Sequence, residues 1–215
     1  MNVTEVIAGR GIEEVLHFTT NHGLTGILRT GAIMSRKRLP DEDRLVYIFE
    51  PNAKYRRDIE WLNYVNLSIS DINWSFFNIA ANKWYKGTEK WWCILSFRPE
   101  IMEHEGVIFS TTNNKYDACK REAGYSGLEA LFGSPIIEYD SGDIAIRGTN
   151  HLSNRPTSNQ AEVLYPKKLS IDFLQKIYVR HEEELDALAG IFEFLSIPPV
   201  NVELAPGRFL GEQHQ

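Results

Sequence analysis

The chain has 215 residues, of which 43% are hydrophobic and 12% aromatic, enough apolar side chain for one globular domain with a buried core. The net charge of −6 and the pI of about 5.6 argue against a protein that coats nucleic acid by charge alone, but they leave room for a local basic groove. Cys93 and Cys119 have neither metal-ligand spacing nor the density of a disulfide framework. With no basic and apolar leader pattern and no apolar run of about 20 residues, we expect no signal peptide, no membrane span and a cytoplasmic location.

The first predicted elements are a short strand and a helix. Residues 15–18 are apolar and predict the strand, and the two threonines after them can cap a helix. Apolar residues recur at helical spacing from Leu24 to Leu28, and Gly31 is expected to end the helix. After a basic cluster and a turn, a second strand is predicted over residues 45–49.

The central part of the chain is rich in strand patterns. Residues 64–70 alternate with a period of two, which puts every second apolar side chain on one face of a strand. Residues 72–84 carry many aromatic side chains and predict either a helix or an irregular lid. Two further strands are predicted over residues 91–97 and 107–110.

Regular patterns weaken from residue 111 to residue 159, where one helix is predicted over residues 128–132. A stretch of this length with little regular structure is usually a functional loop or a misread pattern. Beyond it we expect a helical turn and strand over residues 173–179, an amphipathic helix over 182–195 and a last strand over 200–204. Strands outnumber helices without alternating strictly with them, so the predicted fold class is α+β.

The segment Ser158–Pro166 is the one around which the functional reading is organised. Residues 163–165 suit a buried strand, so Glu162 would lie where a polar loop becomes a strand, held rigidly but still open to a cleft. A carboxylate in that position can bind sugar hydroxyls or stabilise positive charge that develops on a sugar. The alternative is an ordinary surface glutamate that opens a strand.

Familiar nucleotide-binding and catalytic signatures are absent from the sequence. It has no Gly-rich phosphate loop, no His-Glu-x-x-His and no Gly-x-Ser-x-Gly, so a bound nucleotide would need another device. The triplet His17–Phe18–Thr19 is a candidate, because a histidine at a strand end can bond a ribose hydroxyl and a threonine beside it can orient a planar amide. The alternative is a half-buried histidine bonded to the backbone, beside a helix-capping threonine.

Two arginines, Arg56 and Arg57, precede the strand pattern at residues 64–70. The guanidinium fork suits a diphosphate or a developing charge, and the alternative is a solvated loop pair. Tyr64 and Asn66 could line the same cleft, or they could pack at a strand edge.

Basic and aromatic residues interleave in the segments 83–86 and 90–92. Bases can stack on such rings while cations meet phosphate, so Trp84, Tyr85 and Lys86 form a candidate nucleic-acid surface, whereas Trp92 is expected in the core. Scattered cations in the long middle region could make it locally basic, although such charges are often merely solvated: Lys115, Lys120, Arg121, Arg147 and Arg155.

Three segments resemble, in their order and spacing, the DarT family of DNA ADP-ribosyltransferases, which are toxins of bacterial toxin–antitoxin pairs. They are the His17–Phe18–Thr19 triplet with the helix pattern ending at Gly31, the polar turn after the strand at residues 109–113, and Gln160–Leu164 around Glu162.

The resemblance implies a single ADP-ribosyltransferase-like domain over residues 1–215, with a split antiparallel sheet and flanking helices. It implies NAD as a substrate held without a Rossmann motif, no metal, transfer of ADP-ribose to a base in single-stranded DNA, and a macrodomain antitoxin as partner. The site residues that it implies are Glu162 with Arg56 or Arg57 in catalysis, and His17 and Thr19 at NAD. To these, the residue patterns add Phe18, Leu24, Tyr64 and Asn66 at NAD, and Trp84, Tyr85, Lys86, Lys115, Arg147 and Arg155 at DNA.

The sequence departs from the usual family pattern at two places. Gly23 stands where members often carry Asn, and the strand at residues 64–70 is less aromatic than the commonest version. We interpret both as pointing to the branch that modifies guanine rather than thymine. The alternatives are a protein or RNA acceptor, or a non-catalytic module that binds single-stranded nucleic acid.

Overall fold

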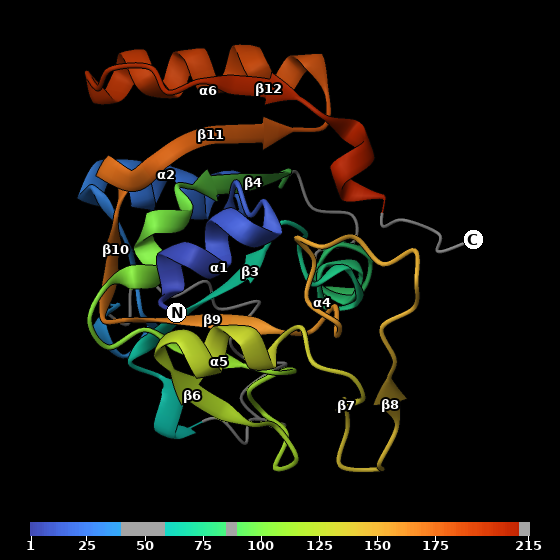
Figure 1. Ribbon diagram of the computed structural model, residues 1–215. Helices are drawn as coiled ribbons and strands as arrows, with labels where there is room; N and C mark the ends of the chain where they lie inside the picture. Colours follow the sequence, from blue (N-terminus) through green and yellow to red (C-terminus); the bar gives the residue numbers. More distant parts are fainter. Residues whose placement is uncertain (40–58, 85–89, 211–215) are drawn as a thin grey trace.

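A large, mostly antiparallel sheet organises the molecule in the computed structural model, which describes residues 1–39, 59–84 and 90–210 (Figure 1). Within these residues, eight strands form it in the order β12-β11-β4-β1-β3-β9-β5-β6, and β11 and β12 are its parallel pair. Their bounds, in that order, are Val202–Leu204, Leu174–Val179, Trp92–Phe97, Val15–Thr20, Tyr64–Ile69, Glu162–Pro166, Ile108–Ser110 and Arg121–Ala123. The predicted α+β fold with a split antiparallel sheet and flanking helices is confirmed.

The split lies between β1 and β3. In the described part of the chain these strands pair at Val15 with Ile69 and at Leu16 with Ser68, and the pairing goes no further. Beyond that point β1 continues along β4 for its whole length, whereas β3 continues along β9. His17 is therefore the first residue of β1 beyond the last pair with β3.

Alternating side chains bury both faces of the sheet. Val15 and the residues opposite it on the neighbouring strands, Ile69 and Phe97, belong to a large core. Helices α1 (Val3–Arg10), α2 (Asn21–Thr30), α5 (Gly124–Ala130) and α6 (Glu182–Leu195) pack against the sheet in this core. Leu16 joins a smaller core on the other face, where α4 (Trp74–Ile79) and the 3₁₀ helix Pro206–Phe209 pack. Successive side chains of β1 point to opposite faces of the sheet, and a different set of helices covers each face.

The helix after β1 begins and ends as the sequence predicts. The Thr20 hydroxyl accepts a hydrogen bond from the Gly23 N–H and caps α2. Gly31 ends the helix in the left-handed conformation at φ 71°, which costs glycine no steric penalty. Leu24 and Leu28 face the core, as expected.

The middle of the chain is more regular than the sequence predicts. The helix expected over residues 128–132 is α5, and it starts at Gly124. The same region also contains β6 and the hairpin of β7 (Ile136–Ile137) and β8 (Ile144–Ala145), which extends away from the sheet in Figure 1. These strands are too short for periodicity to reveal them.

The remaining elements are short. β2 (Ala32–Met34) pairs with β10 (Lys168–Ser170), and α4 runs on into the π-helical turns Ala80–Trp84. Further 3₁₀ helices are Arg36–Arg38, Ile59–Trp61, Pro99–Glu103 and Ile171–Phe173. The strand predicted over residues 45–49 lies outside the described residues. In the described ranges we find no helix with the length and apolar character that a bilayer crossing requires.

Candidate active site

Glu162 opens β9, and within the described residues its carboxylate accepts hydrogen bonds from β3 and from the loop after β5. One oxygen, Oε1, accepts a hydrogen bond of 3.0 Å from the side-chain amide of Asn66, and Oε2 accepts one of 2.8 Å from the Asn114 main-chain N–H. The side chain is 9% exposed. The alternative of an ordinary surface glutamate is therefore excluded, because this one is buried and oriented.

The sheet register explains the contact with Asn66. Asn66 of β3 lies opposite Leu164 of β9, so Glu162 is its diagonal neighbour on the same face. On the other side of β9, Glu162 lies opposite Ser110 of β5. Strand pairing thus fixes the main chain of Glu162 between β3 and β5.

His17 meets the same residue of β3 from the opposite strand. Its Nδ1 lies 3.1 Å from the main-chain carbonyl of Asn66. A carbonyl oxygen can only accept, so Nδ1 carries the proton and Nε2 of the neutral ring is left as an acceptor. Burial lowers the pKa of His17, and the bond to the Asn66 carbonyl opposes this shift more weakly, so the neutral ring is favoured.

The two ends of Asn66 therefore connect the two residues on which the sequence argument depends. Its carbonyl bonds the His17 imidazole, and its side-chain amide bonds the Glu162 carboxylate. The structure brings His17 and Glu162 together across the place where the sheet splits. The alternative interpretation of the triplet is present in part: His17 is bonded to the backbone, but the threonine that caps α2 is Thr20 and not Thr19.

Phe18 and Leu24, both expected near a ligand, serve packing in the described structure. The Phe18 ring lies 5.4 Å from that of Phe77 in an edge-on contact and 5.8 Å from that of Trp92. Leu24 is completely buried in the large core. Trp92 is a core residue, as the sequence predicts.

Thr19 and Tyr64 lie at the two sides of the split. Thr19 is 7% exposed, and its carbonyl accepts a weak hydrogen bond from the Cys93 thiol. The Tyr64 ring packs against Trp61 at 5.3 Å, at the end of β3 that pairs with Pro166 rather than at the Glu162 end. Tyr64 thus lies opposite the end of β9 that is farther from Glu162.

Several predicted site residues lie outside the described part of the chain. These are Arg56, Arg57, Tyr85, Lys86 and the side chain of Trp84. Their assignments stay predictions.

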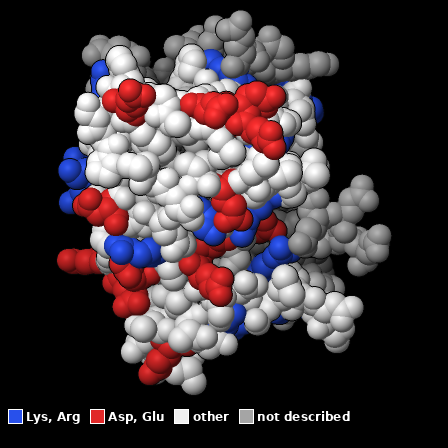
Figure 2. Space-filling model, turned by 90° about the horizontal axis from the view of Figure 1, so that it is seen from above, with Lys and Arg blue, Asp and Glu red and all other residues white. Residues whose placement is uncertain are grey.

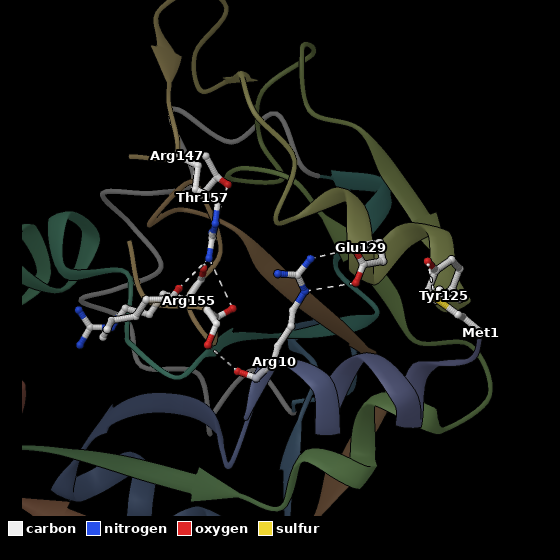
Figure 3. A network of polar contacts seen from close by, with 9 residues as sticks. Met1, Arg10, Tyr125, Glu129, Arg147, Arg155 and Thr157 are labelled. Atoms are coloured by element: carbon white, nitrogen blue, oxygen red, sulfur yellow. Dashed lines mark hydrogen bonds and ion pairs between the residues drawn. The ribbon is translucent and has the colours of Figure 1, made fainter. Parts of the chain in front are cut away.

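The segment that leads into β9 is braced by arginines, as Figure 3 shows. The Arg147 guanidinium donates to the main-chain carbonyls of Arg155 at 2.8 Å and Leu152 at 2.7 Å, while Arg155 pairs with Asp71 at 3.3 Å. Burial lowers the pKa of Arg147, with the nearby Arg10 guanidinium acting in the same direction. Arg147 and Arg155, which we expected at DNA, thus use their guanidinium groups to hold this loop in place.

Other bonds tie the same segment to the rest of the molecule. The Thr157 N–H donates to the Leu131 carbonyl at 2.9 Å, just past α5. The Ser158 hydroxyl donates to the Glu138 carboxylate at the end of the β7–β8 hairpin. Lys115, the remaining predicted DNA contact, is exposed and lies over the Tyr116 ring at 4.7 Å.

A cavity of about 630 Å³ adjoins the start of β9. Ser158, Asn159 and Ala161 line it from the β9 side, and Trp74 and Arg208 line it from the opposite side. A second hollow of about 650 Å³ lies between α6 and β12, among apolar side chains and away from Glu162. The first cavity thus lies beside the residues that precede Glu162, and the second does not.

The sequence did not predict two residues that contact this site directly or through a neighbour. Asn114 was not singled out, although it directly follows the polar segment 109–113, and Arg121 was named only as a scattered cation. The structure places the Asn114 N–H on Glu162 and the Arg121 guanidinium on Asn114. A main-chain donor leaves no trace in the sequence, so no local signal marks the first contact.

Residues 16–210 match the family model described as "DarT: ssDNA thymidine ADP-ribosyltransferase, DarT". The chain belongs to the DarT family. It is therefore an ADP-ribosyltransferase, as the sequence predicts. No curated protein sequence matches this DarT-family chain closely enough to count as a relative.

Solved DarT structures share the fold. Thermus sp. 2.9 DarT in complex with ADP-ribosylated ssDNA aligns with a TM-score of 0.65 at 15% identity, covering 93% of this chain and 97% of the other. The same Thermus protein in complex with NAD+ aligns with a TM-score of 0.63 at 15% identity, covering 92% and 97%. Thermosipho africanus DarTG in complex with ADP-ribose aligns with a TM-score of 0.61 at 14% identity, covering 92% of this chain and 51% of the other.

Proposed function

We propose that this DarT-family chain transfers ADP-ribose from NAD to a base in single-stranded DNA, within one ADP-ribosyltransferase-like domain over residues 1–215. The observation that carries the proposal is the Glu162 carboxylate, buried and oriented by Asn66 and Asn114, next to a neutral His17. The bound NAD+ and ADP-ribosylated ssDNA of the Thermus structures support it, since their fold is the same.

NAD cleavage explains why an oriented carboxylate is needed. The bond between nicotinamide and ribose breaks through an oxocarbenium-like state, as in glycoside hydrolysis, and nicotinamide leaves as a neutral group. Glu162 would hold a hydroxyl of that ribose and offset the growing positive charge. Because hydrogen bonds already fix the carboxylate, it would not need to reorganise as the charge develops.

His17 would contact the other ribose of NAD. With the proton on Nδ1, its Nε2 can accept a hydrogen bond from a ribose hydroxyl. Thr19 would orient the nicotinamide amide, and an arginine of the Arg56–Arg57 segment would hold the diphosphate. In this proposal, His17 and Thr19 bind NAD from β1, and Glu162 acts on it from β9.

The new bond would form between the anomeric carbon and a nitrogen of the acceptor base. That nitrogen loses a proton, which Glu162 or solvent would accept once nicotinamide has left. A single strand presents its bases without the cost of extracting one from a duplex. The ordered segment from residue 111 to residue 159 would shape the site for the strand.

DNA would be held by local contacts rather than by a broad positive surface. On the face drawn in Figure 2, the Lys and Arg side chains of the described residues lie among Asp and Glu instead of forming one continuous patch. The net charge of −6 agrees with this picture. Salt should therefore weaken DNA binding less steeply than for proteins that neutralise many phosphates.

Guanine is the acceptor base that our reading of the sequence favours, on the basis of Gly23 and the strand at residues 64–70. Thymine is the alternative, because the description of the family names thymidine. We further propose that the chain acts as the toxin of a toxin–antitoxin pair with a macrodomain partner. In support, the chain spans about half of the Thermosipho DarTG chain.

Intact mass analysis of short oligonucleotides tests the proposal. Single-stranded DNA with guanine but no thymine, and DNA with thymine but no guanine, would each be incubated with NAD. We expect a mass increase of one ADP-ribose unit on one of the two, and fragmentation would locate it. Glu162→Gln is the matched control and should give no adduct.

Other results of the same experiment would point elsewhere. Labelled NAD offered to DNA, RNA and protein together would reveal a different acceptor if the label appeared on protein or RNA. Binding of single strands without NAD consumption would indicate a non-catalytic module. The absence of an adduct on every oligonucleotide would contradict the proposed function.

A further inference from the structure

The loop after β5 supplies one of the hydrogen-bond donors that hold the Glu162 carboxylate. Asn114 is 3% exposed, and its main-chain N–H donates to Oε2 of Glu162 at 2.8 Å. A main-chain donor can orient a carboxylate only if the loop that carries it is itself fixed. The question is therefore what fixes Asn114.

Arg121, at the start of β6, fixes both oxygens of Asn114. Its Nε donates to the side-chain Oδ1 at 2.9 Å, and its Nη2 donates to the main-chain carbonyl. The same guanidinium also donates to the carbonyls of Tyr116 at 2.9 Å and Cys119 at 3.1 Å. The Arg121 side chain thus bonds three residues of the loop from Asn114 to Cys119 and holds them around its guanidinium group.

The sheet fixes the distance between the main chains of Arg121 and Glu162. Ser110 of β5 lies opposite Glu162 on one side and opposite Arg121 on the other, so the three residues form one row across β9, β5 and β6. Strand spacing puts Arg121 about 10 Å from Glu162 along that row. The loop from Asn114 bridges this gap.

Asn114 does not hold its own position. Among the described residues, its side-chain Nδ2 is buried and makes no hydrogen bond. A buried donor without a partner is unfavourable, so this orientation of the amide needs other bonds to maintain it. The bonds from Arg121 to its two oxygens provide them.

We infer that Arg121 is a positioning residue for ADP-ribose transfer, acting through the Asn114 main-chain N–H on Glu162. The inference rests on the proposed function. Loss of the guanidinium lets the loop move, and the carboxylate loses one of its donors while keeping the Asn66 bond. A displacement of about 1 Å in a catalytic group can cost about 100-fold in rate, so kcat should fall by about 10- to 100-fold. The KM for NAD should stay unchanged, since the arginine has no part in ground-state binding.

Three substitutions test this chain of contacts. Arg121→Gln removes the guanidinium fork. Arg121→Lys keeps the charge, but its single ammonium lacks the planar fork and the donors for all four oxygens that Arg121 bonds, so it should lose nearly as much rate. Asn114→Ala removes the side-chain contact but keeps the main-chain N–H and carbonyl, so its loss should be smaller than that of Arg121→Gln. Arg98→Gln is the matched control, because Arg98 also bonds a carbonyl, that of Asp172, and lies over an aromatic ring, but away from the site.

A double variant separates positioning from a general effect on the fold. In the Arg121→Gln background, adding Asn114→Ala should cause no further loss of single-turnover rate, because the bond between the two side chains is already gone. Additive losses would overturn the inference, as would unchanged kcat in both Arg121 variants. If Arg121→Gln does not fold, Arg121→Lys and Asn114→Ala carry the test. Absence of transfer by the unmodified protein would instead refute the proposed function, and this inference with it.

Discussion

The bond between Asn66 and Glu162 allows one contact of the proposed active site to be removed without disturbing the contact beside it. Asn66→Ala deletes the side-chain amide that donates to the carboxylate at 3.0 Å. It leaves the main-chain carbonyl that accepts from His17. The substitution therefore isolates the support of the carboxylate from the support of the imidazole.

The size of the effect follows from the burial of Glu162. A hydrogen bond to a charged group contributes about 1.5–3 kcal/mol, and the carboxylate is only 9% exposed, so solvent replaces the lost donor poorly. If the full amount is lost in the transition state, kcat falls by about 10- to 150-fold. Loss of the same bond from the folded ground state lowers the melting temperature by about 3–12 °C for a chain of this size.

The assay measures transfer to an oligonucleotide and NAD affinity on the same variant. We expect kcat to fall while the Kd for NAD stays close to its original value, because the His17 side of the split is intact. Asn201→Ala, at an exposed position before β12, is the control. Weakened NAD binding with normal kcat would refute the reasoning and would favour the sequence hypothesis that Asn66 contacts NAD directly.

Three further predictions concern titration, packing and surface pairing. Burial lowers the pKa of His17 in the folded protein below its ordinary value of 6.5. Between the folded pKa and pH 6.5, the unfolded chain therefore binds a proton at His17 more readily than the folded chain does. The contribution of His17 to the free energy of unfolding is complete above pH 6.5 and is lost as pH falls through the folded pKa. The Kd for NAD should rise over the same range, and a His17→Gln variant that kept this rise would contradict the assignment. Gly127→Ala should destabilise the fold by more than about 2 kcal/mol in chemical denaturation, since a Cβ there would lie 2.1 Å from the Glu122 carbonyl oxygen; a normal unfolding midpoint would show that this turn relaxes freely. Arg10→Ala should cost no more than about 1 kcal/mol, because its ion pair with Glu129 at 2.8 Å is partly exposed, and a double-mutant cycle with Glu129→Ala would measure the coupling.

Much of the fold can be read from local patterns. The helix predicted over residues 182–195 is α6 with the same bounds, because its apolar spacing and its acidic first turn are both local features. The capping of α2 by Thr20 and its end at Gly31 are likewise encoded within a few residues. The short strands between residues 111 and 159 were missed, since two or three residues cannot show a period.

By itself, the sequence singled out His17 and Glu162 as candidates, because the strand patterns next to them are visible locally. It placed His17 at a strand end, whereas β1 continues to Thr20 and His17 lies inside the strand. Only the tertiary structure decided what orients these two side chains. Asn66 is 96 positions from Glu162 and Asn114 is 48 positions from it. Strand register creates the first of these contacts and a main-chain N–H supplies the second, and neither register nor a main-chain donor is written in the identity of any single residue.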